Sequence, residues 1–131
     1  VIKNCNIIDV FSCNTFEGDI GVYMGVIAGF GDLEGKREID AGGRAVAPGF
    51  FDGHVHIESS MVGPAEFARA AVVRGTTSVV ADPHEIANVL GLEGLRYMLD
   101  SSAELPLNVF FMLPSCVPST DLETSGSRLY A

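Results

Sequence analysis

The chain after Pro48 alternates continuous apolar runs with amphipathic segments. The runs at 49–57, 76–81 and 107–113 are typical of buried strands, and the segments 63–75 and 91–102 carry apolar residues at helical spacing. Pro64 opens the first predicted helix, Arg74 lies in its last turn, and Gly75 closes it. The apolar face of the second predicted helix consists of Leu92, Leu95, Met98 and Leu99. The predicted order is therefore strand, helix, strand, helix, strand.

Continuous apolar strands separated by helices favour a parallel α/β sheet whose connections are right-handed crossovers. An open doubly wound sheet and the start of a TIM-type (β/α)8 barrel both fit this order. A dinucleotide-binding sheet would require a glycine-rich turn after its first strand, and the stretch HVHIESSMVGP has none. A complete barrel takes about 250 residues. The sequence therefore predicts a partial barrel that holds the first three β/α units.

Residues 1–47 read differently, as short strands and tight turns rich in glycine. We expect a small antiparallel β unit that is too short to bury a sandwich core alone. The predicted domains are the N-terminal part of a composite β-sandwich at 1–47 and the first part of a barrel at 48–131. We also expect the chain to be an N-terminal piece of a longer protein.

Composition narrows the classes of partner. The formal net charge of −9 argues against a nucleic-acid groove and against an anionic membrane surface, because both recruit Lys and Arg. No apolar run approaches the ~18 residues of a membrane span. Cys5, Cys13 and Cys116 are odd in number and widely spaced, which predicts neither a disulfide framework nor a zinc knuckle. We expect a reducing, cytoplasmic setting.

Two of the three histidines, His54 and His56, lie two residues apart at the end of the first predicted strand. Alternate residues of a strand point to the same face, so Asp52 and Glu58 could lie on the side of the two imidazoles. Catalytic groups gather at this end of barrel strands, and two neutral imidazoles invite a divalent cation. Two ligands make an incomplete site, so the alternative of two ordinary core or loop histidines stays open at this point.

The segment ADPHEIANV follows the second predicted strand and carries His84 and Glu85 to the same rim. These two residues are candidates for contacting substrate, for supporting a metal ligand or for an additional metal. The alternative is a tight turn in which Asp82 or Asn88 caps a helix.

The last candidate site residues are Ser115 and Cys116, which follow the third predicted strand, and Glu58, which follows the first. Ser115 and Cys116 lie in LPSCVPST, where no base for a nucleophilic cysteine is identifiable and small residues that shape a pocket are favoured. Glu58 could accept the N–H of an imidazole, or only end the strand together with its neighbouring serines.

The string DAGGRAVAPGFFDGHVHIES resembles the junction of the amidohydrolase superfamily, where a β-sandwich segment meets a metal-binding barrel through P-G-x-x-D-x-H-x-H. Three longer segments are similar to the adenine deaminase family within it: GHVHIESSM, GTTSVVADPHEIANVLG and FFMLPSCVPSTDLETSG. These segments follow all three predicted strands, and the similarity covers nearly the whole chain.

The resemblance implies hydrolytic deamination of adenine to hypoxanthine and ammonia, with adenine and water as the small-molecule partners. It implies two divalent metal ions, Mn²⁺ or Fe²⁺, and it makes His54 and His56 metal ligands. A bridging carboxylate, later histidines and a proton-shuttling aspartate are expected beyond Ala131, so we expect this chain to be inactive alone. Whether the full-length protein forms a homo-oligomer stays open.

Two alternatives remain beside deamination. One is a dihydroorotase-like or deacetylase-like amidohydrolase acting on a cyclic or N-acyl amide, and the other is a non-catalytic metal-binding module.

Overall fold

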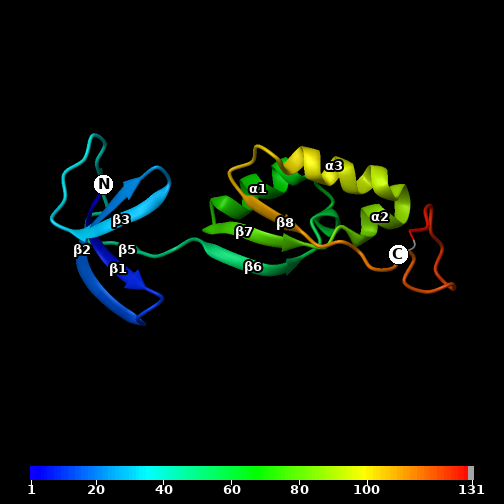
Figure 1. Cartoon of the computed structure of the whole chain (residues 1–131), viewed down its shortest axis with the longest axis horizontal. Coiled ribbons are helices and arrows are strands. Elements are labelled where there is room, and N and C mark those ends of the chain that lie inside the picture. The colour runs from blue at the N-terminus through cyan, green and yellow to red at the C-terminus, as the bar shows by residue number, and fades with distance from the viewer. Residues whose placement is uncertain (130–131) are drawn as a thin grey trace. The chain divides into compact units, whose positions relative to one another are not determined.

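The computed structural model describes residues 1–129 and divides into two compact units, Val1–Pro48 and the segment from Gly49 onward (Figure 1).

The N-terminal unit is a five-stranded mixed sheet. Strands β1 (Ile2–Asp9), β2 (Asn14–Tyr23) and β3 (Val26–Gly31) are antiparallel neighbours, while β4 (Ile39–Asp40) and β5 (Ala45–Val46) both pair with β1 in parallel. Met24 and Gly25 both have positive φ between paired Tyr23 and Val26, as a type I′ hairpin turn requires. The prediction of an antiparallel unit is therefore wrong for β4 and β5, which pair in parallel. The composite β-sandwich stays a prediction.

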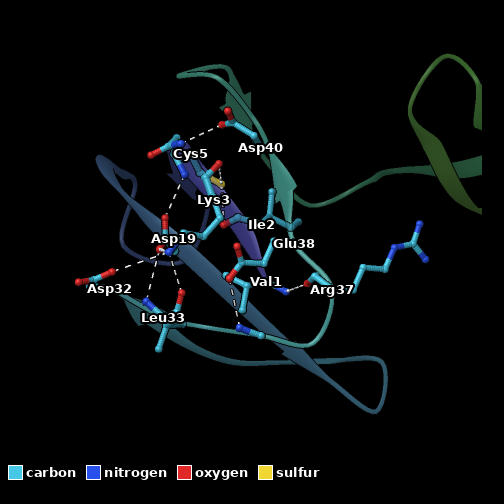
Figure 2. Close-up of polar contacts among 12 residues, drawn as sticks. Val1, Ile2, Lys3, Cys5, Asp19, Asp32, Leu33, Arg37, Glu38 and Asp40 are labelled. Atoms are coloured by element: carbon cyan, nitrogen blue, oxygen red, sulfur yellow. Dashed lines mark hydrogen bonds and ion pairs between the residues drawn. The ribbon is translucent and has the colours of Figure 1, made fainter.

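The N-terminal unit has a polar cluster around Asp19 and a small apolar core of Cys5, Ile7, Ile20 and Ala41. Asp19 is buried, and its carboxylate lies 2.7 Å from the Lys3 ammonium. It also accepts hydrogen bonds from the backbone N–H groups of Asn4 at 3.0 Å and Leu33 at 3.3 Å. Figure 2 shows Lys3 and Leu33 converging on this carboxylate. The arrangement ties the loop after β3 to β1 and β2.

The second unit is a three-stranded parallel sheet in the order β6 (Phe50–Val55), β7 (Thr76–Ala81), β8 (Asn108–Phe111). A short 3₁₀ turn, η1 (Glu58–Ser60), and helix α1 (Pro64–Val72) connect β6 to β7. Helices α2 (His84–Leu90) and α3 (Leu92–Ser102) connect β7 to β8. The strand order follows the sequence, and α1 and α3 lie along the same side of the sheet (Figure 1).

The core of this unit lies between the sheet and these helices. Val79 and Ala81 of β7 are fully buried there, packed with Ala68 of α1 and Met98 of α3. The other side of the sheet carries exposed apolar rings: Phe51 and Phe110 are stacked with their centroids 5.9 Å apart. Within this unit, the helices therefore cover one face of the sheet only. No helix among the described residues is long and apolar enough to cross a membrane.

Three details differ from the sequence-based expectations. The segment 84–90 forms helix α2, whereas the alternative drawn from the sequence was a tight turn leading into a helix capped by Asp82 or Asn88; neither side chain caps α2 or α3. Helix α1 ends at Val72, two residues before Arg74, because left-handed Gly75 closes the turn with its own N–H on the Val72 carbonyl.

The third difference concerns the apolar face of α3. Leu95 and Met98 are buried, whereas Leu92 and Leu99 are about half exposed. The face that contacts the sheet is thus narrower than the apolar stripe in the sequence.

Candidate metal centre

The two histidines of the first strand meet at its carboxyl end. His54 is in β6 and His56 lies one residue beyond it, and their Nε2 atoms are 3.1 Å apart. The pairing of β6 with β7 shifts between Asp52 and Val55, so simple alternation is interrupted within the motif. The two imidazoles nevertheless point at one another.

Asp82 joins the histidines from the next strand. It is the first residue after β7, and its N–H donates to the Val55 carbonyl at 2.9 Å, which extends the ladder past the end of the sheet. The ligand atoms of His54, His56 and Asp82 all lie within 4.8 Å of one another.

These three side chains suit a divalent cation. Nitrogen ligands bound at about 2.1 Å on one ion lie roughly 3.0 to 3.4 Å apart. The observed separation of 3.1 Å between the two Nε2 atoms falls within that range. Two imidazoles and one carboxylate form a donor set that accepts zinc, iron or manganese, and three ligands leave coordination positions for further groups.

A second carboxylate holds the outer side of His56. Glu85 Oε2 lies 3.0 Å from His56 Nδ1, and Ser59 Oγ donates to Glu85 Oε1 at 2.5 Å. Partial burial by itself would raise the pKa of the Glu85 carboxyl. The hydrogen bond from Ser59 and the neighbouring His56 outweigh it, so the pKa of Glu85 lies below its ordinary value.

The Glu58 side chain contacts the backbone of α2 and not an imidazole. Its Oε1 accepts the N–H of Ile86 at 3.2 Å, in the first turn of α2, and its Oε2 is buried without a hydrogen-bond partner among the described residues. Glu58 thus links η1 to α2, and Glu85 links α2 back to η1 through Ser59. The imidazole acceptor in the structure is Glu85.

The remaining candidates lie outside the cluster. Asp52 accepts the backbone N–H of His54 at 3.1 Å. His84 Nε2 lies 3.1 Å from Ser119 Oγ. Ser115 and Cys116 are exposed and contact each other at 3.8 Å. None of these four side chains contributes a ligand atom to the cluster of His54, His56 and Asp82.

Asp82 is the site residue that sequence reasoning missed as a ligand. The available signal was its position, because the carboxyl ends of adjacent parallel strands lie at one edge of a sheet. An Asp-Pro step is also a common turn, and that interpretation obscured the signal.

The model of the Amidohydrolase family matches residues 45–130, which include both histidines, Asp82 and Glu85. The chain belongs to the amidohydrolase family. This confirms the resemblance drawn from the Pro-Gly junction and the H-x-H motif. Members of the family are metal-dependent hydrolases built on a TIM-barrel type fold, which agrees with the α/β sheet and the His-His-Asp cluster.

Several curated relatives match the whole chain. An adenine deaminase of Clostridium acetobutylicum is 56% identical over 131 residues, and an adenine deaminase 2 of Carboxydothermus hydrogenoformans is 57% identical over 131 residues. Each alignment covers 100% of this chain and 23% of the relative. The chain therefore spans about a quarter of the length of these amidohydrolases.

Among solved structures, the L-hydantoinase (dihydropyrimidinase) from Arthrobacter aurescens superposes with a TM-score of 0.66 at 26% sequence identity. The superposition covers 84% of this chain and 26% of that one.

Proposed function

We propose that the full-length protein deaminates adenine hydrolytically: the bond from C6 to the exocyclic nitrogen breaks, a bond from C6 to the oxygen of water forms, and hypoxanthine and ammonia leave. The observation that carries this proposal is identity of 53–57% with curated adenine deaminases across the whole chain. The proposed cytoplasmic setting rests on the cysteine pattern alone.

Two divalent ions, Mn²⁺ or Fe²⁺, complete the proposed centre. His54 and His56 would hold one ion through their Nε2 atoms, and Asp82 would add an oxygen ligand. Such an ion supplies Lewis acidity that makes a water molecule reactive near neutral pH. The contribution of this chain is to hold two nitrogen lone pairs and one carboxylate at the same sheet edge.

We also propose that β6, β7 and β8 are the first three strands of a (β/α)8 barrel. The support is their sequential order with α1 and α3 on one face, since a doubly wound sheet places helices on both faces. The exposed face of Phe51 and Phe110 would then be the barrel interior, packed by strands that lie outside this chain.

The test measures ammonia release from adenine by the full-length protein purified with manganese. Beside it we would measure a His54→Ala, His56→Ala double variant, an Asp82→Ala variant and a control, Glu104→Ala, at an exposed position outside the site. Deamination should vanish in the double variant together with metal content, fall at least about tenfold in Asp82→Ala, and stay unchanged in the control.

A specific result would contradict the proposal. The fold is shared with a hydantoinase, so the same preparation should be offered cyclic amides. A metal-loaded protein that opens a hydantoin or dihydropyrimidine ring and leaves adenine intact would assign it to amide hydrolysis instead.

A further inference from the structure

We infer that Glu85 is a positioning residue that fixes the tautomer and the orientation of His56 for metal binding, and that Ser59 holds Glu85 in place. The inference rests on the metal centre proposed above and extends it to residues that bind no metal themselves.

The hydrogen-bond chemistry around His56 sets its tautomer. A carboxylate only accepts hydrogen bonds, and Glu85 Oε2 lies 3.0 Å from Nδ1. The proton of a neutral His56 ring therefore resides on Nδ1. This leaves Nε2 with a free lone pair, and Nε2 is the atom that faces His54 at 3.1 Å.

The Glu85 carboxylate is itself held at both oxygens. Oε2 binds His56, while Oε1 accepts from Ser59 at 2.5 Å, and Ser59 belongs to η1 three residues after His56, the last residue of the H-x-H motif. A carboxylate with both oxygens engaged has a defined plane, which in turn defines the plane of the imidazole.

The backbone that carries Glu85 is also fixed. Glu58, the neighbour of Ser59, binds the N–H of Ile86, the neighbour of Glu85. Two reciprocal carboxylate contacts thus clamp η1 against the first turn of α2. The Glu85 side chain, which orients His56, is therefore held between the 3₁₀ turn η1 and helix α2, and not by an irregular loop.

His54 lacks an equivalent support in the described residues. Its ring contacts His56, and its own backbone N–H contacts Asp52, but the structure describes no hydrogen bond at its Nδ1. His54 is exposed, whereas the His56 side chain is 33% exposed. The two ligands differ: His56 is set in advance, and His54 can adjust to the ion.

The competing explanation is that Glu85 only attaches η1 to α2. Both roles predict lower stability when Glu85 is removed. Only the positioning role predicts that metal affinity changes in a protein that still folds, so the test measures the two quantities separately.

The experiment uses the full-length protein stripped of metal and titrated with Co²⁺, whose visible absorption reports coordination. Variants are Glu85→Gln, Glu85→Ala and Ser59→Ala, with Glu93→Ala as the matched control, since Glu93 is an exposed carboxylate on α3 paired with Arg96. Thermal unfolding of each metal-free variant is recorded in parallel.

We expect the Co²⁺ dissociation constant to rise about 10- to 100-fold in Glu85→Ala, and by less in Ser59→Ala. The Co²⁺ absorption band should shift in both. Glu85→Gln keeps the size and an acceptor oxygen but loses the charge, so it should fold as the parent does and bind Co²⁺ with intermediate affinity. Glu93→Ala should bind as the parent does.

Co²⁺ affinity and absorption equal to the parent in a folded Glu85→Gln and a folded Glu85→Ala would overturn the inference. If Glu85→Ala does not fold, the Glu85→Gln and Ser59→Ala titrations decide in the same way. Failure of the proposed deamination is a separate result, because Co²⁺ binding is measured without adenine.

Discussion

At the scale of single residues, the contacts of His56 explain the geometry of the site. One ring nitrogen faces Glu85 and the other faces His54, so the neutral ring has its hydrogen and its lone pair in defined places. Asp82 is placed by one backbone hydrogen bond to Val55. The site is therefore set by the ends of two strands and one carboxylate from a helix.

Asp19 gives a residue-scale prediction about pH. A hydrogen bond from the Lys3 ammonium holds the pKa of the Asp19 carboxyl below its ordinary value, and the same contact raises the pKa of Lys3. The stabilising contribution of Asp19 is therefore fully present above its unfolded pKa of about 3.9 and is lost as pH falls through its folded value. The contribution of Lys3 is lost as pH rises through its folded pKa, above about 10.4.

Asp19→Asn should lower the thermal midpoint of the N-terminal unit by several degrees near neutral pH. As the pH is lowered into the acid range, the thermal midpoint of this variant should then decrease less than that of the parent. Thermal unfolding followed by circular dichroism across pH would measure both effects. Asp32→Asn is the matched control, because Asp32 is fully exposed and 3.7 Å from the same ammonium. If the thermal midpoint decreases as steeply with falling pH in Asp19→Asn as in the parent, the acid sensitivity does not come from Asp19.

At the scale of elements, the short helix α2 connects the site to the loop after β8. The Asn88 carbonyl, near the end of α2, accepts from the Gly126 N–H at 2.8 Å, the Ser127 N–H at 3.1 Å and Ser125 Oγ at 2.9 Å. Val117 and Leu129 from this loop pack with Ala87 and Leu95. The loop thereby satisfies a helix-end carbonyl and buries an apolar cluster.

Gly91 is the point at which this arrangement is most sensitive to substitution. It joins α2 to α3 with φ 58° and ψ −135°, a backbone conformation that residues other than glycine rarely adopt. A Cβ at this position would collide with Ser127. Gly91→Ala should therefore destabilise the second unit by about 1–3 kcal/mol. Urea unfolding would measure it.

Gly53→Ala is the control for Gly91→Ala, since a Cβ at Gly53 meets nothing within 4 Å and its φ is not positive. Equal unfolding midpoints for the two variants would show that the turn at Gly91 imposes no such constraint.

At the scale of the whole molecule, the described residues leave apolar surface uncovered. Phe50, Phe51 and Phe110 on the sheet are each more than half exposed. A single sheet layer with one bare apolar face and unpaired edges tends to associate. Within residues 1–129, the cluster of candidate metal ligands consists of His54, His56 and Asp82, which are too few for the two ions proposed above.

Residues 1–131 produced alone should therefore show no adenine deamination and should retain less than one metal per chain. They should also bind a hydrophobic dye and self-associate, because the bare sheet face is apolar. Metal analysis, ammonia assay and sedimentation velocity would check this. Turnover with two tightly bound metals would show that the remaining part of the full-length protein is dispensable.

The sequence by itself determined the features that depend on local periodicity and spacing. The three parallel strands, the helices α1 and α3, and the approach of His54 and His56 follow from apolar runs, helix-end residues and a two-residue step along a strand. Family membership followed as well, since it rests on dense agreement of short segments.

Tertiary structure decided the features that depend on which strand ends meet. Asp82 is a turn residue by its local sequence and lies beside the histidines only because β7 pairs with β6. Glu85 and Glu58 are both plausible imidazole acceptors by position, and the pairing of η1 with α2 decides between them. A hydrogen bond between residues 29 positions apart leaves no periodic signal, because the fold that joins them is determined by burial of the sheet.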